Sequence, residues 1–266
     1  MRAMALSAPG ASLQMQERAN PMPGDGEIRV KVSACGVCRT DLYVVDAELP
    51  GIKYPIIPGH EIVGRIDLVG NNVTTRQVDD RDGIPWLGHT CGVCRFCKEG
   101  MENLCDNPLF TGYMRDGSFA THTIADARSV YAFTRSGDTA AQDFGRRLGA
   151  VWAGASDQLP DTPLDAAIIY APAGELAPAA VRKGGRVVCA GIHMSDIPSF
   201  PYSLLWEERQ PVSVADLTRQ DGRDFLKIIP QAGIRAKTTA FPLSEANKVL
   251  QKLRTGQILG AAVLQL

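Results

Sequence analysis

The chain has 266 residues, of which 45% are hydrophobic and 21% charged, a composition typical of a globular protein with room for two modest cores. Its 28 basic and 29 acidic residues nearly cancel and form no basic run, so nucleic acid is not an expected partner. No apolar stretch approaches the ~18 residues of a membrane span, and the N-terminus lacks the apolar core of a signal peptide. We therefore expect a cytoplasmic protein without a membrane partner.

The first portion of the chain is expected to be rich in β-strands and to end near Ser129. Alternating and apolar runs punctuated by Pro and Gly predict strands over residues 27–34 and 61–69.

Beyond that point, short apolar strands alternate with helical stretches, a pattern that indicates a parallel α/β sheet. These segments are residues 130–133, 138–150, 165–171 and 186–191, of which 138–150 is helical. A final unit follows, with a strand over residues 237–241, a helix N-capped by Ser244 and a closing strand over residues 260–266.

A cluster of cysteines marks a hydrophilic stretch of the β-rich portion. Cys-x-x-Cys-x-x-Cys is followed after seven residues by a fourth cysteine, giving Cys91, Cys94, Cys97 and Cys105. Two-residue gaps let thiolates turn back onto one ion, and four sulfurs complete a closed tetrahedral zinc site. Alternatives are an iron–sulfur cluster and unpaired thiols. We expect structural zinc.

Two further residues, Cys38 in ACGVCRTDLY and His60 in YPIIPGHEIVG, each lie beside a predicted strand. A lone Cys is usually a small buried hydrophobe and a lone His a core or surface residue. Together they suit a catalytic zinc, which takes about three protein ligands and keeps an open position. Asp41 is expected to accept the second ring proton of His60 and so fix its tautomer.

These motifs, with GIPWLGHTCGVCRFCKEGMENLC and VRKGGRVVCAGIHMSDIP, closely resemble the zinc-dependent alcohol dehydrogenases of the medium-chain dehydrogenase/reductase superfamily. The resemblance covers nearly the whole chain. It implies a GroES-like, β-rich catalytic domain (residues 1–129), a Rossmann-like cofactor domain (130–234) and a C-terminal segment that returns to the catalytic domain (235–266).

The resemblance also implies roles for individual residues. It makes Cys38, His60 and the exchangeable Glu61 ligands of catalytic zinc, and Thr40 the hydroxyl that passes the alcohol proton outward. Where the family often has a relay histidine, this chain has Tyr43, so proton release is expected to be altered or mediated by solvent. The resemblance further implies that Arg39 contacts the pyrophosphate of the cofactor and that Trp86 forms a wall of the substrate pocket. Ala190 and Gly191 are expected to make further cofactor contacts.

Two elements of the family pattern are missing. The third catalytic cysteine has no counterpart, since after Cys105 the chain has only Cys189, expected to be a buried strand residue. No Gly-x-Gly-x-x-Gly turn occurs in the sequence. In addition, the stretch that resembles the end of the family's catalytic segment stops at Ser129, and the stretch that resembles its second cofactor strand starts at the next residue, Val130. We infer an internal gap there and an incomplete Rossmann-like domain.

The cofactor and activity follow from these assignments. An acidic residue after the second cofactor strand would bind the ribose of NAD, whereas Arg135 favours NADP over NAD. We expect a zinc-containing, NAD(P)-dependent oxidoreductase that interconverts small alcohols and aldehydes or ketones, as a homo-oligomer. The alternatives are an inactive, zinc-stabilised family member acting as a binding module and a zinc-ribbon nucleic-acid binder, which the acidic pI of about 6.4 opposes.

Overall fold

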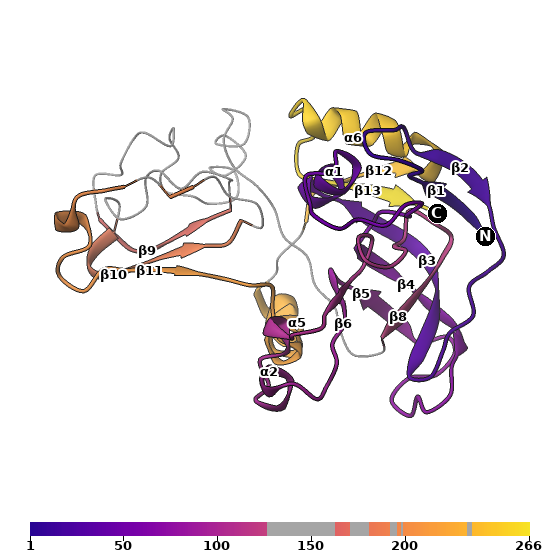
Figure 1. Cartoon of the computed structure of the whole chain (residues 1–266), viewed down its shortest axis with the longest axis horizontal. Helices are drawn as coiled ribbons and strands as arrows, with labels where there is room; N and C mark the ends of the chain where they lie inside the picture. Colours follow the sequence, from indigo (N-terminus) through magenta and orange to yellow (C-terminus); the bar gives the residue numbers. More distant parts are fainter. Residues whose placement is uncertain (127–162, 171–180, 192–195, 198, 233–235) are drawn as a thin grey trace. The chain divides into compact units, whose positions relative to one another are not determined.

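The structure is a computed structural model that describes residues 1–126, 163–170, 181–191, 196–197, 199–232 and 236–266. The chain forms two compact units, each described by itself below. Unit 1 comprises Met1–Ala132 and Leu217–Leu266, and unit 2 comprises Phe133–Asp216 (Figure 1).

The main sheet of unit 1 has six strands in the described residues, ordered β12-β13-β3-β4-β5 with β8 also paired to β3. Their bounds are β3 Glu27–Val37, β4 Glu61–Val69, β5 Arg81–Ile84, β8 His122–Asp126, β12 Thr238–Pro242 and β13 Ala261–Gln265. The strands predicted over residues 27–34, 61–69, 237–241 and 260–266 are therefore confirmed.

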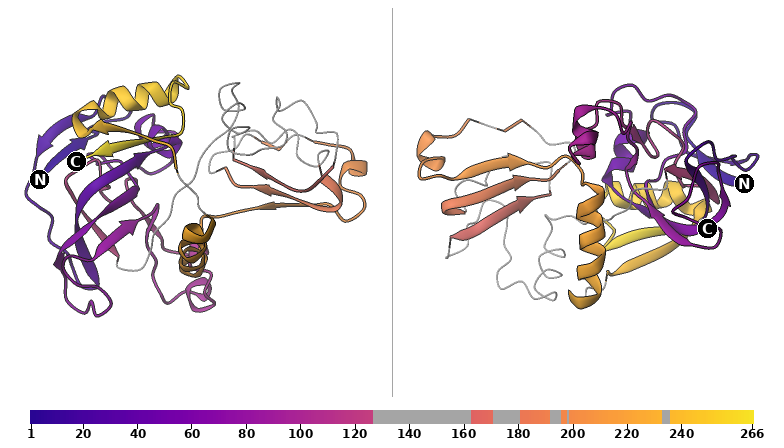
Figure 2. Two further views of the ribbon diagram at one scale, coloured as in Figure 1. Left: turned by 180° about the vertical axis from the view of Figure 1, so that it is seen from behind. Right: turned by 90° about the horizontal axis from the view of Figure 1, so that it is seen from below.

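The sheet forms because one face of its strands is apolar. Ile28, Val30 and Val32 alternate along β3 and are all buried, as the two-residue period of a strand requires. Helix α6, Ala246–Arg254, buries Val249 and Leu250 and packs on α1 and β12. It is the yellow helix labelled in Figure 1 and seen again in Figure 2.

The C-terminal segment returns to the sheet of unit 1. Strand β13 pairs antiparallel with β3 and parallel with β12, so residues far apart in the sequence share one ladder. One detail of the prediction is wrong: α6 is N-capped by Glu245 without a side-chain hydrogen bond, not by Ser244. A 3₁₀ turn, η3 Leu243–Glu245, precedes the helix and places Ser244 inside the turn.

Smaller elements complete unit 1. Strands β1 and β2 pair antiparallel, as do β6 and β7. The bounds are β1 Arg2–Ala5, β2 Gln14–Glu17, α1 Arg39–Val45, β6 Leu87–His89, α2 Arg95–Lys98, η1 Glu102–Leu104, β7 Leu109–Phe110 and α5 Arg219–Ala232. Among the described helices, none is long and apolar enough to cross a membrane.

In unit 2 the described strands form a parallel sheet in the order β11-β10-β9. The bounds are β9 Leu164–Ile169, β10 Val181–Cys189, η2 Tyr202–Leu204 and β11 Gln210–Ser213. The parallel sheet and the two strands expected over residues 165–171 and 186–191 are thus confirmed, with ends at Ile169 and Cys189. Residue 171, the strand expected over 130–133 and the helix over 138–150 lie outside the described residues.

The division into units differs in position from the predicted domain boundaries. The described contacts place α5 in unit 1, whereas the sequence analysis assigned residues 130–234 to the cofactor domain. The boundaries at 129/130 and 234/235 remain predictions.

Three glycines pack their backbones together where the chain enters β4. A Cβ on Gly117 would lie 2.0 Å from the carbonyl oxygen of Gly59, and one on Gly112 would lie 2.9 Å from the Gly59 nitrogen. Gly59 itself has φ +98°, which L side chains rarely adopt. No side chain fits between these segments, so they fix the backbone that carries the next residue, His60.

We therefore expect Gly117→Ala to lower the free energy of unfolding by about 3 kcal/mol, the upper range for overpacking against unyielding atoms. Denaturant titration measures it. Gly10→Ala is the control, because a Cβ at Gly10 meets nothing within 4 Å and only its φ of +66° opposes substitution, at a cost of about 1 kcal/mol. Equal losses for the two variants would contradict this account.

Candidate functional site

The first half of the site is built at the start of helix α1. Cys38 is the N-cap: its sulfur accepts from the backbone N–H of Thr40 at 3.3 Å, while its own N–H donates to Asp41 Oδ2 at 3.0 Å. This reciprocal capping box fixes the direction of the Cys38 side chain.

The second half comes from His60, which follows Gly59 and directly precedes β4. Its Nε2 lies 3.2 Å from Cys38 Sγ. Zinc bonds of ~2.3 Å to sulfur and ~2.0 Å to nitrogen at a tetrahedral angle place the two donor atoms about 3.5 Å apart. The observed separation is close to this value, so the pair fits one zinc ion.

A single carboxylate, that of Asp41, joins the two halves. Asp41 is 1% exposed; besides the N–H of Cys38, it accepts from the N–H of Gly59 at 3.1 Å. Its Oδ1 also lies 3.2 Å from His60 Nδ1, off the direction of a well-aligned hydrogen bond. The carboxylate therefore holds both ligand segments and orients the imidazole so that Nε2 faces Cys38.

Negative charge gathers around this imidazole. Burial alone would lower the pKa of His60, but the charges of Cys38 and Asp41 outweigh it and hold that pKa well above its ordinary value. Glu61 begins β4, and burial raises the pKa of its carboxyl group. A Cβ at Gly36 would lie 2.2 Å from Glu61 Oε2, so glycine leaves room for this carboxylate. The charges of Cys38 and Asp41 therefore favour a cation beside His60.

Aromatic rings border the same imidazole. Trp86 lies edge-on to His60 with ring centroids 5.0 Å apart, and it stacks on Phe110 at 5.1 Å and on Tyr113 at 5.6 Å. Rings on opposite faces of an indole would be at least about 7 Å apart, twice the carbon contact distance. Phe110 and Tyr113 are 6.3 Å apart and therefore share one face of Trp86.

The other predicted residues of α1 follow Cys38 along the helix. Thr40 and Tyr43 are buried, and the guanidinium of Arg39 lies over the ring of Tyr43. The cofactor residues Ala190 and Gly191 follow β10 in unit 2, where Cys189 is its last residue and half-buried. Arg135 lies outside the described residues.

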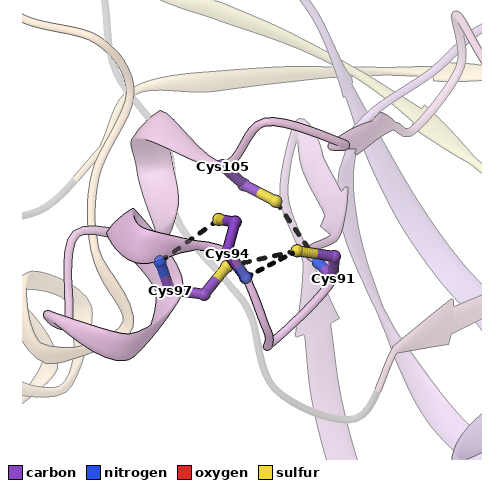
Figure 3. A group of neighbouring side chains, drawn as sticks. All are labelled: Cys91, Cys94, Cys97 and Cys105. Atoms are coloured by element: carbon purple, nitrogen blue, oxygen red, sulfur yellow. Dashed lines mark hydrogen bonds between the residues drawn. The ribbon is translucent and has the colours of Figure 1, made fainter.

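Four sulfurs meet at a second centre in unit 1, those of Cys91, Cys94, Cys97 and Cys105 (Figure 3). All four lie within 4.8 Å of one another, and those of Cys91 and Cys97 are 3.9 Å apart. Tetrahedral zinc with bonds of ~2.3 Å separates two sulfurs by about 3.8 Å. The spacing therefore fits a zinc ion bound by four cysteines.

The backbone of this lobe, residues 91–105, supports thiolates. The backbone N–H of Cys91 donates to the sulfur of Cys105, that of Cys94 to the sulfur of Cys91, and that of Cys97 to the sulfur of Cys94, all at 3.3–3.5 Å. Backbone hydrogen bonds from Val93 and Cys94 to the Cys91 sulfur lower the pKa of Cys91 to about 6. In contrast, burial and neighbouring sulfurs to which it donates raise the pKa of Cys97 to about 12. Negative charges on closely spaced sulfurs repel one another, and a bound divalent cation would reduce this repulsion.

Helix α5 anchors the cysteine lobe. Arg219 at its start donates its backbone N–H to Glu102 Oε1 at 2.8 Å, and its Nη1 lies 3.4 Å from the same oxygen. Arg219 Nη2 donates to Thr90 Oγ1 at 2.6 Å. Thr90 directly precedes the first cysteine, and Glu102 lies between the third and the fourth. One arginine therefore holds both sides of the lobe.

Because Glu102 is 5% exposed, Arg219→Ala leaves a buried carboxylate without its cation. Breaking such a pair costs 3–5 kcal/mol when both partners are fully buried; Arg219 is partly exposed, and we expect about 2–3 kcal/mol. Zinc release to a colorimetric chelator should accelerate accordingly. Arg95→Ala is the matched control, because its pair with Glu99 in the same lobe is exposed and is worth about 0.5 kcal/mol or less. Similar release rates for the two variants would exclude the anchoring role.

Comparisons with known proteins agree with this geometry. A family model for the alcohol dehydrogenase GroES-like domain matches residues 24–135. The chain is 36% identical over 311 residues to a probable alcohol dehydrogenase AdhA of Mycobacterium tuberculosis (strain CDC 1551 / Oshkosh), covering 92% of this chain and 90% of that protein. It is 30% identical over 338 residues to an alcohol dehydrogenase of Moraxella sp. (strain TAE123), covering 99% of each.

Both aligned stretches are longer than the 266 residues of this chain, so it lacks residues that those relatives have within the aligned regions. This supports an internal gap, while its place at Ser129 and Val130 remains a prediction.

Solved structures share the fold. A cinnamyl alcohol dehydrogenase from Sorghum bicolor matches with a TM-score of 0.87 at 18% identity, covering 99% of this chain and 97% of that one. The alcohol dehydrogenase from Aeropyrum pernix matches with a TM-score of 0.85 at 19% identity, covering 100% of each. The expected fold class, a GroES-like domain with a Rossmann-like domain, is confirmed. Because the Mycobacterium tuberculosis relative is 36% identical over 92% of this chain, the chain belongs to the alcohol dehydrogenase family of the medium-chain dehydrogenase/reductase superfamily.

Proposed function

We propose that this chain is a zinc-dependent oxidoreductase that interconverts alcohols and aldehydes or ketones by hydride transfer with NAD or NADP. The observation that carries the proposal is the 3.2 Å approach of Cys38 Sγ to His60 Nε2, with the Asp41 carboxylate behind both. A thiolate and an imidazole that leave further positions open are the donors of a catalytic rather than a structural zinc.

The chain supplies three parts of this chemistry around the metal. Zinc, when bound, acts as a Lewis acid on the substrate oxygen. Cys38 and His60 hold it, and Glu61 is the carboxylate positioned to exchange onto it in a chain without the family's third cysteine. Thr40, the second residue of the same helix and buried, is suited to take the alcohol proton outward, with Tyr43 next along the relay.

The range of accepted substrates is proposed to depend on the aromatic rings of Trp86, Phe110 and Tyr113. Phe110 and Tyr113 occupy one side of the Trp86 indole and stack it in place beside His60. Trp86 thus offers a large, rigid apolar surface next to the metal ligands, which suits small aliphatic or aromatic alcohols.

Cofactor binding is proposed for four residues. Arg39 is the pyrophosphate contact, and Ala190 and Gly191 follow the carboxyl end of β10, where parallel α/β sheets bind ligands. Arg135 favours NADP over NAD. A second zinc at the four cysteines is structural. The relatives named alcohol dehydrogenases favour this enzyme over an inactive family member. We also propose a homo-oligomer.

The proposal predicts two zinc ions per chain and alcohol-dependent formation of reduced nicotinamide cofactor. Asp41→Asn should lower catalytic zinc affinity or turnover by about 10- to 100-fold, the usual effect of losing a ligand's charged partner. Metal analysis after dialysis and steady-state kinetics measure the two effects. Glu17→Gln, on exposed strand β2, should change neither. One zinc per wild-type chain together with no turnover of any alcohol tested would refute the proposal.

A further inference from the structure

Arg39 and Tyr43 are four residues apart on α1 and therefore lie on the same side of the helix. The guanidinium carbon of Arg39 is 5.7 Å from the centroid of the Tyr43 ring. This is within the ~6 Å range of a cation–π interaction. Tyr43 is 4% exposed and belongs to the buried face of α1, so its ring is a fixed support.

The charge of Arg39 is otherwise unopposed. Among the residues that the structure describes, no carboxylate lies within ion-pair distance of its guanidinium, and its buried Nε has no hydrogen-bond partner. Several other arginines of unit 1 differ, because each of these has a carboxylate partner. They include Arg29 with Asp67, Arg76 with Asp82, Arg115 with Glu27, Arg219 with Glu102 and Arg254 with Asp46.

The kind of partner decides what an arginine can still bind. A carboxylate would fix the guanidinium but also cancel its charge and occupy the N–H groups that a phosphate needs. An aromatic ring attracts the cation through its face and leaves the charge and the edge N–H groups available. A half-buried arginine held by a ring is therefore prepared for an anion.

We propose that Tyr43 is a positioning residue whose ring holds Arg39 as the anion-binding group for the pyrophosphate of the nicotinamide cofactor. The inference rests on the proposed function and adds to it a role for the ring of Tyr43. This role is separable from any role of its hydroxyl in proton release, because the ring and the hydroxyl can be altered independently.

The test varies the ring's electron density while keeping its size. Tyr43→Phe removes only the hydroxyl, and fluorinated phenylalanines at the same position weaken the attraction of the ring for cations stepwise. We expect Tyr43→Phe to keep the wild-type Kd for reduced cofactor, measured by fluorescence titration. Affinity should then fall by about two- to fivefold across the fluorination series. The series should have no effect in an Arg39→Ala background.

A second readout needs no cofactor. In NMR spectra of the free protein, the Arg39 Nε–Hε signal should carry a ring-current shift that persists in Tyr43→Phe and is lost in Tyr43→Leu, with thermal unfolding confirming that each variant folds. Titration with inorganic pyrophosphate distinguishes a general anion site from one that requires the whole cofactor. In either case the fluorination series must weaken binding.

The outcomes separate the two claims. Wild-type protein that binds neither NADH nor NADPH contradicts the proposed function, while the NMR shift still decides the pairing. A cofactor Kd that is constant across the fluorinated series, or an Arg39 signal unaffected by Tyr43→Leu, overturns the inference. If instead Tyr43→Phe changes the pH profile of kcat and not the cofactor Kd, the hydroxyl takes part in proton release and the ring role stands.

Discussion

The site depends on one buried carboxylate. Asp41 accepts hydrogen bonds from the N–H groups of Cys38 and Gly59 and lies against His60 Nδ1, so it ties the start of α1 to the segment that leads into β4. A buried carboxylate is costly unless it is hydrogen-bonded or paired, and these partners meet that cost. The same contacts aim the Cys38 sulfur and His60 Nε2 at one point, so the stability of the site and its geometry have a common origin.

A second network performs the corresponding task for the cysteine lobe. The lobe contributes few buried apolar side chains, and its described support comes from backbone N–H groups donating to sulfur and from Arg219. A divalent ion would supply the cohesion that a small apolar core cannot. Since Arg219 reaches both Thr90 and Glu102, metal in the lobe and the attachment of α5 should stabilise each other.

Sequence could predict the donors because their chemistry is local. The four cysteines follow from residue type and spacing, whereas the Cys38 and His60 pair and its partner Asp41 follow from residue type together with the family resemblance; the structure brings each group together. The stack of Phe110 and Tyr113 on Trp86 was missed, although aromatic residues three apart were a usable signal. Arg219 could not be predicted, because its partners Thr90 and Glu102 lie more than a hundred residues away in the sequence. The prediction of Ser244 as the N-cap was wrong because a 3₁₀ turn precedes α6 and moves the N-cap one residue later, to Glu245. No sequence motif indicates this turn.

The central claim is that Cys38 and His60 share one metal ion distinct from the ion of the four cysteines. An anomalous-difference map of crystals grown from metal-replete protein, collected on either side of the zinc absorption edge, tests this directly. The account predicts two peaks per chain, one among the sulfurs of Cys91, Cys94, Cys97 and Cys105 and one within bonding distance of both Cys38 Sγ and His60 Nε2. A map with a strong peak at the four cysteines and none beside Cys38 and His60 would contradict it.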